Sequence, residues 1–207
     1  MAENKIEKGR IEEALSKYNL EISDEEVKEA VKKIIAEKVH ENDNLEVKKF
    51  LMGSVELTTL KTTDSDESVL AFTERVNQFD EQYPTLPHVA TICVYPRFAK
   101  IVSETLEVDG VEIACVSGSF PSSQALIEVK TVETSLAVKD GATEIDMVLS
   151  VGAFLSGDYE TVCDEIQQMK EACGDKKMKV ILETGCLKTA ANARSSVRDL
   201  SGHPGIL

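Results

Sequence analysis

The stretch Gly141–Val151, GATEIDMVLSV, contains a short apolar run typical of a strand buried in a parallel sheet. One acid, Asp146, interrupts this run. A buried carboxylate is costly unless it is paired or hydrogen-bonded, so its presence indicates a catalytic group or a satisfied polar network. The alternative is an exposed acid or a structural partner for a lysine. Asp146 is therefore the first candidate functional residue.

Similar apolar or β-branched runs occur on both sides of this stretch and alternate with amphipathic helical patterns. The predicted strands are Val55–Leu60, Val89–Tyr95, Val111–Ser117, Ile145–Leu149 and Lys179–Leu182. Short polar loops join these strands to the helices, which indicates parallel pairing through right-handed crossovers. The sequence therefore predicts an α/β fold.

Several polar residues are placed to cap the predicted helices. Asp64 or Ser65 precedes the first helix of this series, and Asp158 precedes a later one. Ser122 and Ser123 are expected to cap the helix between the third and fourth strands. That helix carries an apolar stripe formed by Leu126, Val129, Val132 and Leu136.

Residues 1–50 are highly charged and read as helical, with Ser23 and Glu26 spaced as a capping box. We expect them to form a helical extension on the outside of the main domain. The predicted organisation is therefore an N-terminal helical extension at 1–50 followed by the α/β domain.

Composition limits the function classes. With 207 residues, 42% of them hydrophobic, the chain can form one substantial core. A formal charge of −14 argues against a nucleic-acid surface but allows a small phosphorylated ligand in a local pocket. The five cysteines form no CxxC pair, so neither a zinc site nor a disulfide framework is indicated. Without an apolar run of about 18 residues or a secretory signal, the expectation is a cytoplasmic protein with no membrane partner.

Two architectures share the strand–helix repeat: an open doubly wound sheet and a (β/α)8 barrel. Neither GxGxxG nor GxxxxGK[ST] is present. A flavodoxin-like binding domain is a weaker alternative, because 5% aromatic residues and no tryptophan give a flavin little to stack on. The barrel is favoured because polar residues recur along the strands, as a shared central site requires: Glu56, Thr58, Cys93, Asp146, Lys179 and Glu183.

Six runs, in consistent order and spacing over about residues 50–192, closely resemble deoxyribose-phosphate aldolase. They are LTTL at 57–60, ATICVYPRF at 90–98, ACVSGSFPSS at 114–123, GATEIDMV at 141–148, FLSGDYE at 154–160 and KVILETGCLK at 179–188. The resemblance implies a (β/α)8 class I aldolase without metal or cofactor. Such an enzyme reversibly cleaves 2-deoxy-D-ribose 5-phosphate into glyceraldehyde 3-phosphate and acetaldehyde through a lysine Schiff base, in deoxyribonucleotide and carbohydrate catabolism. A homo-oligomer is compatible with it.

The resemblance also assigns residues. It implies that Asp146 is the proton donor and acceptor on strand four, and that Cys93 and Lys179 line the substrate pocket on strands two and five. Glu56 stands at a pocket position where the family often has aspartate. Its extra methylene moves the carboxylate by roughly an ångström, which matters if this group positions substrate.

The chain departs from the family pattern after Asn192, where it reads ARSSVRDLSGHPGIL. The family's Schiff-base lysine on strand six, its second lysine on strand seven and its phosphate-binding loops have no counterpart here, and the tail does not resemble the next helix. The resemblance therefore implies a partial barrel domain at 51–192, with about five of eight βα units from a truncated or frameshifted reading frame, and an atypical tail at 193–207. The best substitute nucleophile is Lys179. The competing hypothesis is an inactive fragment or pseudoenzyme that acts only as an interaction module, with the edge of strand five exposed.

Overall fold

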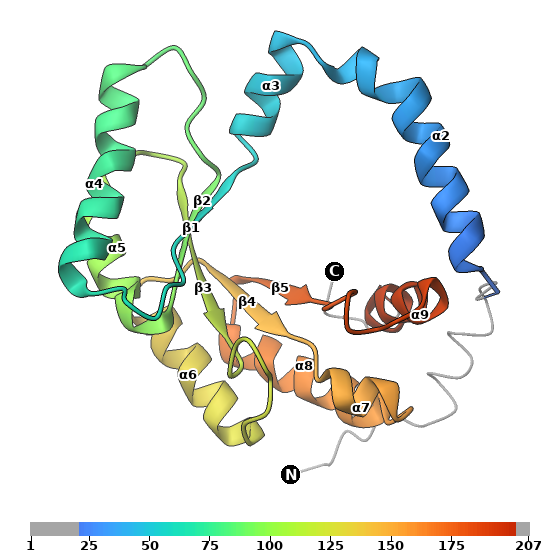
Figure 1. Ribbon diagram of the computed structural model, residues 1–207. Coiled ribbons are helices and arrows are strands. Elements are labelled where there is room, and N and C mark those ends of the chain that lie inside the picture. The colour runs from blue at the N-terminus through green and yellow to red at the C-terminus, as the bar shows by residue number, and fades with distance from the viewer. Residues whose placement is uncertain (1–20, 202–207) are drawn as a thin grey trace.

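A computed structural model describes residues 21–201, with side chains as far as residue 196. Its centre is one sheet of five parallel strands in chain order (Figure 1). The strands are β1 (Glu56–Thr58), β2 (Thr91–Val94), β3 (Glu112–Ser117), β4 (Glu144–Val148) and β5 (Lys177–Ile181). A doubly wound sheet reverses its strand order at a switch point, whereas a barrel keeps the order of the chain. The α/β class and the partial barrel are therefore confirmed.

Helices connect the strands and cover one face of the sheet (Figure 1). Ser65 caps α4 and Asp158 caps α8, as the sequence predicts. A short helix, α7, was not anticipated. The helical elements are α2 (Asp24–Asn42), α3 (Leu45–Met52), α4 (Asp66–Gln82), the 3-10 turn η1 (Pro96–Phe98), α5 (Ala99–Thr105), α6 (Ile127–Lys139), α7 (Val151–Leu155), α8 (Tyr159–Cys173) and α9 (Ala190–Ser201).

The two faces of the sheet differ in polarity because successive side chains along a strand point to opposite faces. Ile92, Ile113 and Ile145 point toward the helices and belong to the main apolar core. The opposite face carries a smaller buried apolar cluster of Cys93, Ala114 and Val116. Register places Val116 beside Asp146, and Asp146 beside Lys179, so acid and base side chains share this second face.

Helix α6 packs through a face that its apolar pattern does not indicate. The apolar stripe Leu126, Val129, Val132 and Leu136 is exposed and does not pack against the sheet. The buried residues are instead Lys130, Thr134 and Ala137. Thr134 Oγ1 lies 2.7 Å from Ser117 Oγ of β3, and the two hydroxyls form a hydrogen bond. Small and polar contacts therefore fix this helix on the sheet.

The N-terminal helices stand apart from the sheet (Figure 1). The Ser23–Glu26 capping box is present at the start of α2, yet no residue of α2 is buried. A hydrogen bond joins α2 to α9: the Ala190 N–H donates to Asp24 Oδ1 at 2.7 Å. Helix α9 crosses the predicted boundary at residue 193, and the domain limits stay a prediction. Within residues 21–201, each helix is too short or too polar to span a bilayer.

Gly141 precedes β4 in a conformation that side chains rarely adopt, with φ of 111°. A Cβ at this position would lie 2.5 Å from both Cβ and Oγ of Ser103. We expect Gly141→Ala to lower the free energy of unfolding by about 1–2 kcal/mol in urea denaturation, through backbone strain and overpacking. Gly152→Ala is the control, because its Cβ would meet no atom within 4 Å. Equal losses in the two variants would contradict this explanation.

Candidate active site

Asp146 lies in the middle of β4 with only 2% of its surface exposed. Its Oδ2 accepts a hydrogen bond from Lys179 Nζ at 2.8 Å. Its Oδ1 is buried and has no hydrogen-bond partner among the residues that the structure describes. A buried carboxylate that is only half satisfied is uncommon and identifies a candidate functional group.

Lys179 joins the two edges of the sheet. Its Nζ lies 2.8 Å from Asp146 on the neighbouring strand and 2.8 Å from Glu56 Oε1 on β1. β1 and β5 are the first and last strands of the five-stranded order, so a flat sheet would hold these residues far apart. The sheet must curve strongly around the polar face, as it does in a barrel.

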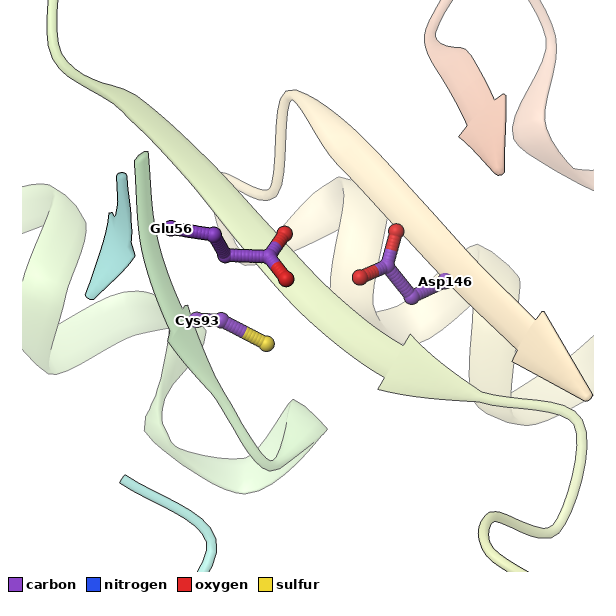
Figure 2. A group of neighbouring side chains, drawn as sticks. All are labelled: Glu56, Cys93 and Asp146. Carbon is purple, nitrogen blue, oxygen red and sulfur yellow. The ribbon is translucent and has the colours of Figure 1, made fainter. Parts of the chain in front are cut away.

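Glu56, Cys93 and Asp146 converge from β1, β2 and β4. One ligand atom from each side chain lies within 4.8 Å of the other two. Figure 2 shows these three side chains directed toward a common space on the polar face. Together with Lys179, they form what we call the inner cluster.

The inner cluster shifts the acidity of Asp146. Burial is the largest effect and disfavours the charged form, while Lys179 opposes it and the nearby Glu56 reinforces it. The net result raises the pKa of Asp146 from 3.8 to about 6. A carboxyl group with a pKa close to neutral can both accept and donate a proton at physiological pH.

Lys179 and Cys93 are held in their protonated forms. Burial tends to lower the pKa of Lys179, but hydrogen bonds and charge attraction from Asp146 and Glu56 outweigh it and raise the pKa. Burial, followed by the charges of Glu56 and Asp146, raises the pKa of the Cys93 thiol to about 12. Neither group is activated as a nucleophile, because nucleophilic attack requires the free amine or the thiolate.

The structure therefore brings together all four residues that the sequence indicates for the site. Glu183, another polar residue at a strand end, lies in the turn after β5 and accepts a weak hydrogen bond from Cys186 Sγ at 3.7 Å. It is not part of the inner cluster.

A second polar network was missed by sequence reasoning. Lys130 Nζ is buried and lies 2.9 Å from Ser123 Oγ and 3.1 Å from Glu165 Oε2. Ser150 Oγ also donates to the Glu165 carboxylate. Ser123 therefore serves this network rather than capping α6, which begins at Ile127 with Leu126 at the cap position. A lysine on an amphipathic helix usually indicates a solvated face, so the pattern gave no signal.

The family model described as DeoC/LacD family aldolase matches residues 51–200. A Caenorhabditis elegans protein provisionally named as a deoxyribose-phosphate aldolase is 34% identical over 189 residues, covering 89% of this chain and 62% of the relative. Deoxyribose-phosphate aldolase from Metamycoplasma hominis is 44% identical over 100 residues, covering 48% of this chain and 46% of the relative.

Among solved structures, deoxyribose phosphate aldolase from Aeropyrum pernix matches with a TM-score of 0.58 and 26% identity. The match covers 76% of this chain and 64% of that enzyme, which is described as a tetramer. This chain thus spans less than two thirds of each of the three relatives. For this chain an oligomer stays a prediction.

Proposed function

Since the chain belongs to the DeoC/LacD family of aldolases, we propose that its inner cluster supplies the proton-transfer groups for reversible aldol cleavage of 2-deoxy-D-ribose 5-phosphate. One observation carries this proposal. Asp146 is buried, is anchored through one oxygen by Lys179, and keeps its other oxygen without a partner in the described chain. That free oxygen is the acceptor that a substrate hydroxyl or a relaying water requires.

The proposed reaction breaks the C2–C3 bond of the open-chain sugar. An amine first condenses with the C1 aldehyde and releases water, and the resulting imine takes up a proton to become the cation that accepts electrons. Asp146, directly or through a water, takes the proton of the C3 hydroxyl. The C3–O electrons form the new carbonyl of glyceraldehyde 3-phosphate, and the C2–C3 pair moves into an enamine. The same carboxyl then returns a proton to C2, and hydrolysis releases acetaldehyde and the amine.

Lys179 has a supporting role in this proposal. Its ammonium bridges Asp146 and Glu56 and holds both carboxylates in place. Because its pKa is raised, it is a poor candidate for the imine-forming amine. We therefore propose that the family's Schiff-base lysine has no substitute in the inner cluster, and that the proton relay is the part of the chemistry this chain carries.

The test supplies an external amine. The full chain is incubated with 2-deoxy-D-ribose 5-phosphate and methylamine, and release of glyceraldehyde 3-phosphate is followed with a coupled dehydrogenase. We expect a rate roughly tenfold above methylamine alone, less than the ~10²–10⁴ of full acid–base catalysis because a free amine is not held in place. Asp146→Asn should remove this gain. Glu144→Gln, which changes an acid two residues earlier on β4, should keep it.

A chain that acts only as an interaction module predicts no rate above methylamine alone in any variant. Borohydride trapping with acetaldehyde, read by peptide mass spectrometry, tests the role of Lys179 separately. An adduct on Lys179 would show that this lysine is the nucleophile and that its proposed supporting role is wrong.

A further inference from the structure

The inner cluster also has the composition of a metal site. Glu56, Cys93 and Asp146 offer two carboxylates and one sulfur, and their ligand atoms lie within 4.8 Å of one another (Figure 2). Zinc-like ions bind this donor set in proteins, usually with four ligands in tetrahedral geometry. The ligands come from three different strands, so no local spacing in the sequence could indicate the site.

A second observation points to a cation at the same place. Asp146 is 98% buried, and its Oδ1 has no partner among the described residues although it belongs to a carboxylate facing Glu56. A buried acceptor of this kind gains strongly from any positive charge that reaches it. The described cluster contains two carboxyl groups and one ammonium, so acidic groups outnumber basic ones at this place.

Lys179 shows that a cation is stable between Glu56 and Asp146. Its ammonium lies 2.8 Å from each carboxylate, yet 52% of its side chain is exposed. A long side chain with this exposure can turn its charged end into water without opening the core. The ammonium and a metal ion would therefore compete for the same two carboxylates.

We propose that Glu56, Cys93 and Asp146 bind a thiophilic divalent cation of the zinc type, which replaces the Lys179 ammonium and keeps water as its fourth ligand. On binding, the Cys93 thiol releases its proton to solvent and forms a metal–sulfur bond, while Lys179 moves out with its proton. Metal bonds of about 2.0–2.3 Å require the three donors to draw closer together. Glu56 is on the edge strand and one third exposed, so its side chain is free to make this adjustment.

This site goes beyond the proposed aldol chemistry and acts against it. A divalent cation bound to Asp146 favours the ionised carboxylate and makes it a weaker base for proton transfer, so the ion is an inhibitor and not a cofactor. Because metal binding can be observed by spectroscopy, the proposed site can be tested independently of any aldolase activity.

The experiment titrates Co²⁺ alone into the full chain carrying Cys186→Ser, which removes the exposed cysteine. We expect a thiolate-to-cobalt charge-transfer band that saturates at one ion per chain and is bleached by Zn²⁺. Cys93→Ser should abolish the band. Cys115→Ala, which removes a buried thiol of β3 that points to the opposite face, should retain it.

Lys179→Met is a second test, in which Co²⁺ binding is expected to become tighter and not weaker. The position is half exposed. Removing the competing ammonium should tighten Co²⁺ binding by about tenfold, whereas a simple loss of structure would weaken it. Three results would each overturn the proposal. They are a band that persists in Cys93→Ser, the absence of a band in both the parent and Lys179→Met, and unchanged Co²⁺ affinity in Lys179→Met.

Discussion

Replacing Lys130 with methionine is expected to lower the free energy of unfolding by about 3 kcal/mol at pH 7, because it breaks a buried ion pair from one side. Lys130 is 1% exposed, and its ammonium is bound by Glu165 and Ser123. Methionine fills the space of the lysine stem but leaves the Glu165 carboxylate without its charge partner. This carboxylate retains 19% exposure, which keeps the loss at the lower end of the range for buried pairs.

Urea denaturation followed by circular dichroism measures this effect. The double variant Lys130→Met/Glu165→Gln should recover most of the loss, since it removes both charges together. Lys100→Met is the matched surface control, because its pair with Glu104 spans 3.8 Å and both side chains are about two thirds exposed. We expect that control to change stability by less than about 0.5 kcal/mol. A loss at Lys130 as small as the one at Lys100 would show that the buried network is not stabilising.

Asp146→Asn is expected to act in the opposite direction and to stabilise the chain by about 2–3 kcal/mol at pH 8. The pKa of Asp146 is raised in the folded protein from 3.8 to about 6, chiefly by burial. The stability that this group contributes is therefore fully present below its unfolded pKa and is lost as pH rises through about 6. At pH 8 the folded protein holds an ionised carboxylate in an unfavourable place, and asparagine removes that charge while keeping the shape.

The same comparison at pH 5 should give about half of this gain, because pH 5 lies between the unfolded pKa of 3.8 and the folded pKa of about 6. Below the unfolded pKa, at about pH 3, the charge-dependent gain should nearly vanish. Urea denaturation at each pH value measures the change. Glu144→Gln should give no comparable gain at pH 8, because Glu144 is ion-paired with Lys177 at 2.7 Å and lies at the less buried start of β4. An equal gain from Asp146→Asn at pH 5 and pH 8 would contradict the assigned cause. A gain in stability together with loss of the methylamine-dependent rate would indicate that the acid is retained for chemistry.

Sequence patterns predicted the parts of the fold that depend on local signals. The run around Asp146 and four similar runs correspond to the five strands, since β-branched and apolar residues fit a buried pleated surface. Side-chain caps such as Ser65 and Asp158 were also predictable, because a cap depends on residues only a few positions away. Convergence of Glu56, Cys93, Asp146 and Lys179 was expected from the barrel resemblance, but their contacts were not.

Features that depend on distant partners could not be predicted in this way. Lys130 is buried because Glu165 on α8 and Ser123 after β3 meet it, and no periodicity within α6 encodes those partners. The apolar stripe of the same helix is exposed, which the periodicity of the helix did not indicate either. The contact between Lys179 and Glu56 depends on the curvature of the whole sheet, which no single strand specifies.

The chain-order arrangement of the sheet has a consequence for synthesis. Each strand pairs with the one made just before it, so the sheet can grow in the direction of translation without waiting for a distant segment. Asp146 is made before Lys179, and a nascent chain that has not yet added β5 must hold this acid without its counter-charge. The fifth strand therefore brings the counter-charge for an acid that the fourth has already buried, and docking of β5 is the step at which Asp146 gains its ion pair with Lys179.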